Sequence, residues 1–402
     1  MKKALTYDDI GIVPKYSEIL SRSDINLTTR FTKNTEITIP VVSSPMDTVT
    51  GYEMALEMMD WGGVGVLHRF NTIEEQARMM NELHTEWDKF FGIGKDFSSY
   101  EETWEKWNSK FNGNLLSSQL TPNKDDWDDL KEDMSFVDEM ETMNKRWRRK
   151  PLCAAIGVTG DYLERAQELV ANGCNVLLID VAHGHHKLVK DTIRELKNGL
   201  RGDVEIIGGS IATGTAAKDL CEWGVDGLRV GIGGGSVCST RIQTGVGVPN
   251  ITSIQDCCII ADTYNVPVIT DGGIGYIADI CKSIGIGADS VMLGSLLSGT
   301  KETPGEIHKD GLWPNERLYK KYSGSASLEN KLKRNESKNV EGYSFRVEYK
   351  GKTKRILNDI SDGLRSSMSY VGASNIEEFQ TKCEFVEVTN AGIIEAKPHL
   401  MN

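Results

Sequence analysis

Eight short apolar runs, separated by stretches with helical periodicity, are the feature that most constrains the fold of this chain. The runs are Pro40–Ser44, Gly63–His68, Cys153–Val158, Val176–Val181, Glu205–Ser210, Gly227–Ile232, Val266–Asp271 and Ser290–Gly294. Apolar runs that alternate with helices are typical of parallel strands buried on both faces. Eight such strand–helix units are the number that a closed (β/α)8 barrel contains. We therefore predict an α/β fold of the TIM-barrel class.

The stretches between the runs show helical patterns. They cover Asp161–Asn172, Lys187–Leu200, Thr215–Trp223, Ile254–Tyr264 and Ile277–Ile284. The main alternative is a doubly wound open sheet, which carries a GxGxxG fingerprint after its first strand. That fingerprint is missing, and in the glycine-rich loop that begins at Gly231 a serine, Ser236, stands where the third glycine belongs. The barrel is the better prediction.

Two segments interrupt the strand–helix alternation. Residues 85–150 are acidic and hold five of the eight tryptophans of the chain. Disordered segments are poor in aromatic residues, so we predict a small helical insertion between strands 2 and 3, with residues 1–84 and 151–402 forming the barrel. Residues 323–343 are polar, and we predict an active-site flap there; an ordinary surface loop is the alternative.

The charge and cysteine content exclude several functional classes. The formal net charge of −12 argues against nucleic acid or an anionic membrane as a partner. No apolar run approaches the roughly 20 residues needed to cross a bilayer, and the N-terminus has no apolar signal region. The eight cysteines include no CxxC pair, which fits a reducing compartment. We expect a cytoplasmic protein.

The glycine-rich loop Gly231–Arg241 holds the best candidate for covalent chemistry. It follows a predicted strand and presents Cys238 with the hydroxyl of Thr240 two residues away. In α/β barrels, the loops after the strands carry the reactive groups. We interpret Cys238 as a nucleophile that Thr240 assists in proton transfer; a buried structural thiol is the alternative.

Loops after the seventh and eighth strands predict a phosphate site. Asp271-Gly272-Gly273-Ile274 and Leu293-Gly294-Ser295-Leu296 offer glycine amides and a hydroxyl, as phosphate loops of barrels do. Asp271 could bind sugar hydroxyls or merely cap its own loop. Met46, in the loop after the first strand, could stack on a flat base or belong to the core.

Two further motifs follow predicted strands. Asp180–His186 contains a His-x-His pair, but no third ligand with suitable spacing follows, so we favour cofactor contact or helix capping over a metal site. Glu302 follows the eighth strand and could act as a general acid or base at the barrel mouth; a solvated surface carboxylate is the alternative.

Taken together, these motifs resemble one family, the purine-nucleotide oxidoreductases that comprise IMP dehydrogenase and GMP reductase. The resemblance covers nearly the whole chain except the insertion. It rests on Leu5–Asp9, Ser44–Thr48, Asp180–His185, Gly231–Arg241, Gly245–Pro249, Asp271–Ile274 and Gly299–Glu306. Dehydrogenases of the family usually carry a pair of CBS modules at the position of the insertion, which is too short for such a pair.

The resemblance implies a homotetrameric barrel that uses a nicotinamide cofactor, and it assigns roles residue by residue. The catalytic residues would be Cys238, which attacks C2 of the purine, with Thr240 and Glu302. The nucleotide would be bound by Ser44, Met46, Ser236, Asp271, Gly273, Gly294, Ser295, Tyr322, Gly324 and Glu341. The cofactor would contact Asp180, Ala182, His183 and Glu302. A potassium ion would be bound at Gly233, Gly235 and Cys238.

The resemblance also bears on which of the two reactions occurs. Dehydrogenases oxidise IMP with NAD and hydrolyse the adduct with water activated by an Arg-Tyr pair on a long flap. Reductases release ammonia from GMP and receive hydride from NADPH without that pair. Here the flap is short and Arg334 is followed by Asn335. Lys320–Ser327 and Leu364–Tyr370 also resemble bacterial reductases. We predict a GMP reductase-like enzyme that uses NADPH, with NAD-dependent IMP dehydrogenase as the alternative.

Other features weaken or complicate this assignment. Ser44-Pro45-Met46 and the tail Asn390–His399 resemble dehydrogenases, whose tail helps a neighbouring subunit to bind potassium. Here Lys397 lies in that tail, and its ammonium group could replace the ion. Ser210 stands where the family usually has an asparagine, and Gly234 where its loop usually has a proline. A catalytically weak purine-nucleotide-binding regulator and a flavin-dependent barrel enzyme are alternatives of other classes.

Overall fold

Eight parallel strands close into a barrel, as the apolar runs predict. They are β4 (Val41–Ser43), β5 (Val64–Leu67), β6 (Cys153–Ile156), β7 (Val176–Ile179), β8 (Glu205–Ile211), β9 (Gly227–Val230), β10 (Val268–Asp271) and β11 (Ser290–Leu293). Neighbours in the sequence are neighbours in the barrel, and pairing of β11 with β4 closes it. The computed structural model describes residues 3–91, 151–200, 204–311, 316–324, 327 and 342–396. The predicted TIM-barrel fold is confirmed.

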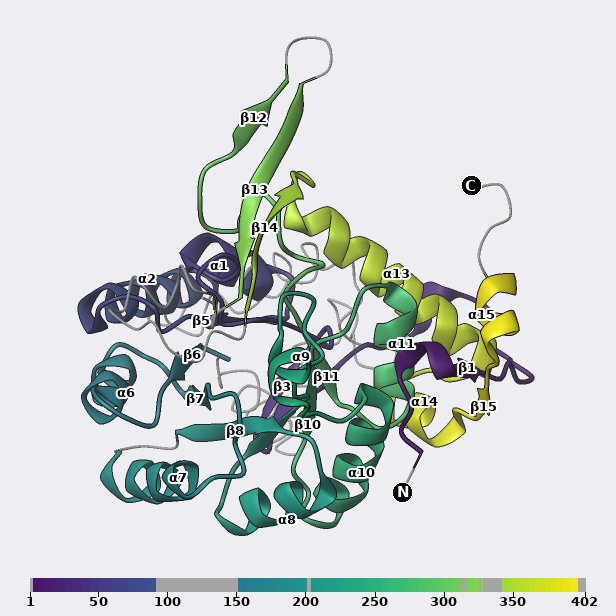
Figure 1. The fold of residues 1–402 in the computed structure, drawn as a ribbon, viewed down its shortest axis with the longest axis horizontal. Coiled ribbons are helices and arrows are strands. Elements are labelled where there is room, and N and C mark those ends of the chain that lie inside the picture. Colours follow the sequence, from purple (N-terminus) through teal and green to yellow (C-terminus); the bar gives the residue numbers. More distant parts are fainter. Residues whose placement is uncertain are drawn as a thin grey trace, which may run out of the picture.

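Helices surround the barrel on its outside (Figure 1). They are α1 (Tyr52–Asp60), α2 (Ile73–Phe91), α6 (Tyr162–Ala171), α7 (Lys187–Gly199), α8 (Gly214–Glu222), α10 (Asn250–Thr263), α11 (Ile277–Gly285) and α13 (Thr353–Val371), with the shorter α9 (Thr240–Thr244), α14 (Ile376–Lys382) and α15 (Asn390–Glu395). The five predicted helices are present. Helix α2 continues into the predicted insertion, which begins at residue 85, and residues 92–150 of that segment lie outside the described residues.

The interior of the barrel is apolar and closed at its amino end. Alternate strand residues form one buried cluster with Phe31 and Ile37. These two come from a hairpin of β2 (Thr29–Thr32) and β3 (Thr35–Ile37). The hairpin is tied down by Glu205, whose carboxylate accepts hydrogen bonds from the hydroxyls of Thr32 (2.7 Å) and Thr35 (2.6 Å). Phe31 is fully buried, so this end of the barrel is sealed and only the carboxyl ends of the strands remain open.

A small antiparallel sheet stands away from the barrel, at the top of Figure 1. It consists of β12 (His308–Asp310), β13 (Arg317–Ser323) and β14 (Ser344–Glu348). The predicted flap connects β13 to β14; its residues 325, 326 and 328–341 lie outside the described residues. One end of β13 reaches the barrel mouth, where its residue Tyr322 is buried and lines the cavity.

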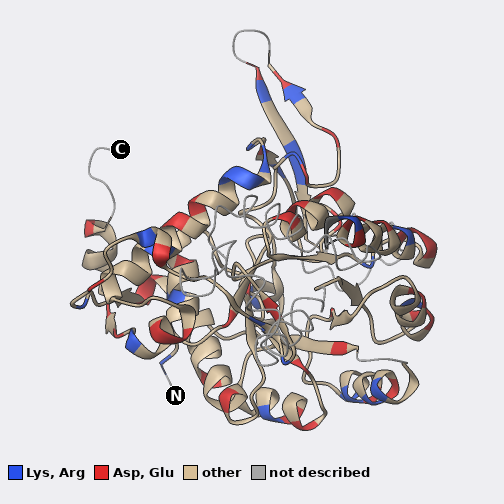
Figure 2. Cartoon of the chain, turned by 180° about the vertical axis from the view of Figure 1, so that it is seen from behind, with Lys and Arg blue, Asp and Glu red and all other residues tan. Residues whose placement is uncertain are grey.

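The ends of the described chain meet in another sheet, where β1 (Ile10–Ile12) pairs with β15 (Phe385–Glu387). On the outer helices, basic and acidic residues are intermixed (Figure 2). Within the described ranges, each helix is too short or too polar to cross a bilayer.

Candidate active site

A cavity of about 460 Å³ opens at the carboxyl ends of the barrel strands. Each strand, or the loop that follows it, contributes to the lining. In strand order these contributions include Ser44, Arg69, Thr159, Asp180, Ser210, Cys238, Asp271 and Gly294. This end of a parallel barrel is where the chemistry of such folds is located. The cavity is therefore the candidate active site.

The cysteine loop after β9 is held against the loop after β10. Gly231 has φ +143°, and a Cβ at this position would lie 1.9 Å from the carbonyl oxygen of Asp271, so only glycine fits. Arg241 fixes the loop from behind, because its Nε and Nη2 donate to the carbonyl oxygen of Ile232 at 3.1 and 3.0 Å. The side chain of Asn250 donates to the carbonyl oxygen of Gly272 and joins the two loops.

Cys238 is half-buried and lines the cavity. Its Sγ lies 3.2 Å from Oγ1 of Thr240, within hydrogen-bond distance for sulfur. The backbone around it pairs with the end of the flap, since the N–H of Tyr343 donates to the carbonyl oxygen of Val237 (3.0 Å) and Gly342 bridges Cys238. A thiol and a hydroxyl are thus placed together at the mouth of the cavity, beside Gly342 and Tyr343.

The predicted phosphate residues meet on one side of the cavity. Ser236, Gly273, Gly294, Ser295 and Tyr322 all line it. The Tyr322 hydroxyl lies 3.5 Å from Oγ of Ser236. Burial raises the pKa of Tyr322, against the opposing effect of its hydrogen bond with Ser236, so the hydroxyl remains a donor at neutral pH. A Cβ on Gly294 would lie 2.9 Å from this hydroxyl, so a larger residue there would force Tyr322 to shift.

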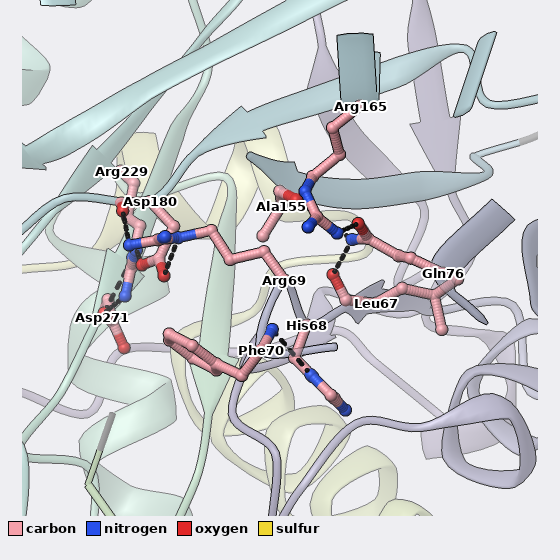
Figure 3. A network of polar contacts seen from close by, with 10 residues as sticks. All are labelled: Leu67, His68, Arg69, Phe70, Gln76, Ala155, Arg165, Asp180, Arg229 and Asp271. Atoms are coloured by element: carbon pink, nitrogen blue, oxygen red, sulfur yellow. Dashed lines mark hydrogen bonds and ion pairs between the residues drawn. The ribbon is translucent and has the colours of Figure 1, made fainter. Parts of the chain in front are cut away.

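An ionic layer crosses the floor of the cavity (Figure 3). Arg229 donates from Nη1 to Asp180 (2.7 Å) and from Nε to Asp271 (2.9 Å). Arg69 adds a second cation beside Asp180, with Nε 3.5 Å from Oδ2. Burial acts to raise the pKa of Asp180, but Arg229 and Arg69 outweigh it and the pKa lies below its usual value. Asp271 is thus oriented by Arg229 rather than left to cap its own loop.

Arg69 and Phe70 sit on a turn that is clamped from outside the barrel. Gln76 donates from Nε2 to the carbonyl oxygens of Leu67 (3.3 Å) and Ala155 (3.0 Å). Arg165, also buried, donates to Oε1 of Gln76 at 2.9 Å (Figure 3). These contacts fix the end of β5 relative to β6, and the guanidinium of Arg69 packs over the Phe70 ring at 5.1 Å.

Most of the predicted site residues gather around this cavity. The lining includes Ser44, Met46, Asp180, Ala182, Gly233, Gly235, Ser236, Cys238, Thr240, Asp271, Gly273, Gly294, Ser295, Tyr322 and Gly324. Glu302 and His183 are not among the lining residues. The Glu302 carboxylate instead accepts the N–H of Thr353 at the start of α13 (2.8 Å). Glu341 lies outside the described residues.

The histidines after β7 are engaged in ways other than metal binding. Nδ1 of His186 accepts the N–H of Leu188 and caps α7, while Nε2 of His185 lies 2.7 Å from Asp219. In the described part of the chain, His, Cys, Asp and Glu form no group that could hold a metal ion. The predicted potassium site would use carbonyl oxygens of the cysteine loop. The carbonyl oxygen of Gly235 already accepts a hydrogen bond from the N–H of Cys238 (3.0 Å). Lys397, which could replace the ion, lies outside the described residues.

Sequence reasoning missed Arg229, Arg69, Phe70 and Thr159, which also line the cavity. One signal was available for Arg229, which is a charged residue within a buried apolar strand. Because arginine is almost never buried without a partner, its position predicts an acidic residue nearby. The other three follow strand ends, and neither His68 before Arg69 and Phe70 nor the glycines on either side of Thr159 form a motif that singles them out.

Comparison with known proteins places these observations in a family. A family model described as "IMP dehydrogenase / GMP reductase domain" matches residues 4–399. Inosine-5'-monophosphate dehydrogenase of Cryptosporidium parvum is 38% identical over 408 residues, covering 99% of this chain and 95% of the relative. The enzyme of the same name from Nitrosopumilus maritimus is 34% identical (99% and 98% covered), and GMP reductase of Leishmania major is 32% identical (99% and 97% covered). The chain belongs to the IMP dehydrogenase/GMP reductase family of purine-nucleotide oxidoreductases.

Proposed function

We propose that this chain binds a purine nucleoside monophosphate in the barrel mouth and forms a covalent bond between Cys238 and C2 of the purine. The observation that carries the proposal is the placement of Cys238 and Thr240, 3.2 Å apart, beside a cradle of glycines and hydroxyls that fits a phosphate. The half-buried carboxylate of Asp271 would accept hydrogen bonds from the ribose hydroxyls, and Met46 would lie against the base.

The opposite side of the cavity fits the nicotinamide half of a dinucleotide. Asp180 offers a carboxylate that stays ionised, and its loop is fixed to β8 because the N–H of Ser210 donates to the carbonyl oxygen of Val181 (3.1 Å). Asp180 and Ala182 would hold the nicotinamide ribose. When bound, this group would accept or supply a hydride at C2. The chain would contribute the thiol, the orientation of both ligands and proton transfer through Thr240.

The identities of the relatives support IMP dehydrogenase over GMP reductase, against the expectation from the flap. The dehydrogenases of C. parvum and N. maritimus are 38% and 34% identical to this chain, compared with 32% for the reductase of L. major. In this reaction the Cys238 sulfur adds to C2 of IMP, the C2 hydrogen leaves as hydride to NAD, and water then displaces the thiol to give the 2-oxo product. We propose this reaction first.

GMP reductase is the second candidate, and one observation favours it. Nowhere in the 402 residues is an arginine followed by a tyrosine, so the water-activating pair of dehydrogenases is missing. Without efficient hydrolysis, the adduct is better suited to form from GMP with loss of ammonia and to be released as IMP after hydride arrives from NADPH.

One assay separates the candidates. The absorbance of reduced nicotinamide is followed with IMP plus NAD and, separately, with GMP plus NADPH. A rise with the first pair supports the dehydrogenase, and a fall with the second supports the reductase. If neither pair turns over while IMP or GMP still binds, the chain is a nucleotide-binding regulator. We further propose a homotetramer, which light scattering would test.

A further inference from the structure

Arg229 occupies a singular position in the barrel: it bridges two carboxylates that belong to different ligand sites. Its neighbours in β9, Leu228 and Val230, pack outward in the large core cluster, so alternation along the strand directs Arg229 into the barrel. There it lies above the apolar interior layer and lines the cavity. Its side chain is only 11% exposed.

The contacts of Arg229 use both edges of its guanidinium. Nη1 reaches Oδ1 of Asp180 at 2.7 Å, and Nε and Nη2 reach Oδ2 of Asp271 at 2.9 and 2.8 Å. A planar guanidinium with fixed donor directions cannot shift toward one carboxylate without changing its geometry to the other. Because the two acids would otherwise be like charges in a buried layer, Arg229 also makes their joint ionisation possible.

The backbone leaves Arg229 little freedom. On the neighbouring strand β8, a Cβ on Gly209 would lie 2.6 Å from both the Cβ and the carbonyl oxygen of Arg229. The ionic layer has weaker contacts at Arg69, the member nearest to solvent. Arg69 has a side chain 29% exposed and a buried Nε without a hydrogen-bond partner, 3.5 Å from Asp180. The layer is thus rigid at Asp271 and Arg229 and less tightly bonded at Arg69.

We infer that Arg229 is a positioning residue that couples the nucleotide site to the dinucleotide site. The inference rests on the proposed function, in which Asp271 holds the nucleotide ribose and Asp180 the nicotinamide ribose. Because Arg229 is bonded to both carboxylates, a first ligand that shifts one carboxylate shifts the guanidinium and, through it, the other carboxylate. The second ligand then meets a carboxylate that has already moved to its bound position, so each ligand strengthens the binding of the other.

The test measures binding by calorimetry in a Cys238→Ala background, in which the covalent step is blocked. IMP and NAD are titrated separately and then each in the presence of the other. We expect one ligand to tighten the other by about 5- to 150-fold, the usual range of coupling between sites. In Arg229→Met the coupling factor falls to about 1. In Arg229→Lys, which keeps the charge but loses the bidentate contacts, it falls to an intermediate value.

A matched control is Arg30→Lys. Arg30 also pairs with a buried carboxylate, Asp289 (3.1 Å), but at the amino end of the barrel. This variant should lose stability while keeping the coupling. Thermal melting of each variant reports folding, and Arg229→Lys carries the test if Arg229→Met does not fold.

The outcomes separate the two claims. A parent protein that binds both ligands independently, or an Arg229→Lys variant that couples them as strongly as the parent, overturns the role of Arg229 and leaves the proposed function intact. A wild-type protein that binds neither IMP nor GMP overturns the proposed function and the inference with it.

Discussion

The sulfur of Cys238 lies 3.2 Å from the hydroxyl oxygen of Thr240, the first residue of the short helix α9. Both side chains project into the cavity at the barrel mouth, next to the loops that form the phosphate cradle. A thiol must lose its proton to attack and regain it when the product leaves. The hydroxyl of Thr240 lies close enough to carry that proton.

Thr240→Val should therefore slow the covalent steps while leaving nucleotide binding almost unchanged. The valine keeps the shape of the side chain and removes the hydroxyl, so kcat should fall by roughly 10²- to 10⁴-fold, the usual contribution of a positioned proton carrier. Steady-state kinetics with both substrate pairs check this. Thr240→Ser is the control and should keep most of the activity. An equal loss in both variants would mean that the methyl group, and not the hydroxyl, matters.

Gly294→Ala should weaken nucleotide binding by crowding the phosphate cradle. The added Cβ would lie 2.9 Å from the hydroxyl of Tyr322 and 3.4 Å from Sδ of Met46. Overpacking of this kind costs about 1–3 kcal/mol, or about 5- to 150-fold in affinity if the strain falls on the bound state.

The matched double variant is Gly294→Ala with Tyr322→Phe, which removes the crowded oxygen. We expect it to bind IMP more tightly than Gly294→Ala alone, although Tyr322→Phe by itself weakens binding. Purely additive losses across this double-mutant cycle would show that the two residues do not share one site.

Phe31→Ala should destabilise the protein without altering its chemistry. Phe31 is fully buried at the amino end of the barrel, away from the cavity at the carboxyl ends. Truncating a buried phenylalanine costs about 3–5 kcal/mol. Urea denaturation would measure the loss, and kcat/KM measured well below the melting temperature should stay within about twofold of wild type. A large drop in kcat/KM for the folded variant would contradict this separation of stability and function.

Asp289 should give stability a distinctive pH dependence. Burial raises its pKa to about 6, against the opposing effect of Arg30. Because the folded state then holds the proton more tightly than the unfolded chain, the Asp289 contribution to stability falls as pH rises from about 4 to above 6, by about 3 kcal/mol for a shift of this size.

The measurement is the free energy of unfolding in urea at several pH values for wild type and Asp289→Asn. The asparagine cannot titrate, so it lacks the Asp289 contribution at every pH. The free energy of unfolding of wild type, relative to that of Asp289→Asn, should therefore decrease as pH rises through this window. A difference that stays constant between pH 4 and 7 would show that Asp289 does not titrate there.

The barrel could be predicted because its strands are buried on both faces and therefore stand out as apolar runs. The small sheets escaped prediction for the opposite reason. Strand β12 has three exposed residues, and β15 has only three residues, two of them exposed, so neither forms a buried apolar run. Pairing of β1 with β15 also joins segments more than 370 residues apart, which local patterns cannot show.

The site was predictable where a residue belongs to a local motif, as Cys238, Gly273 and Ser295 do. The ionic layer could not be predicted. Arg229 is 49 residues from Asp180 and 42 residues from Asp271 in the sequence, and these contacts form only because the register of the barrel strands brings the three side chains together. Glu302 shows that a position after a strand does not by itself place a side chain in the cavity. It follows the eighth strand as expected, yet its carboxylate accepts the N–H that begins α13, where an acid is favoured by the helix dipole.

The most direct test of covalent chemistry at Cys238 is the turnover rate of Cys238→Ala compared with wild type, measured with IMP plus NAD and with GMP plus NADPH. We predict that wild type turns over at least one pair. The variant should lose that activity by on the order of 10⁴-fold or more, while its affinity for the nucleotide changes little. A variant that retains turnover within tenfold of wild type would contradict the claim that the reaction passes through a bond to this cysteine.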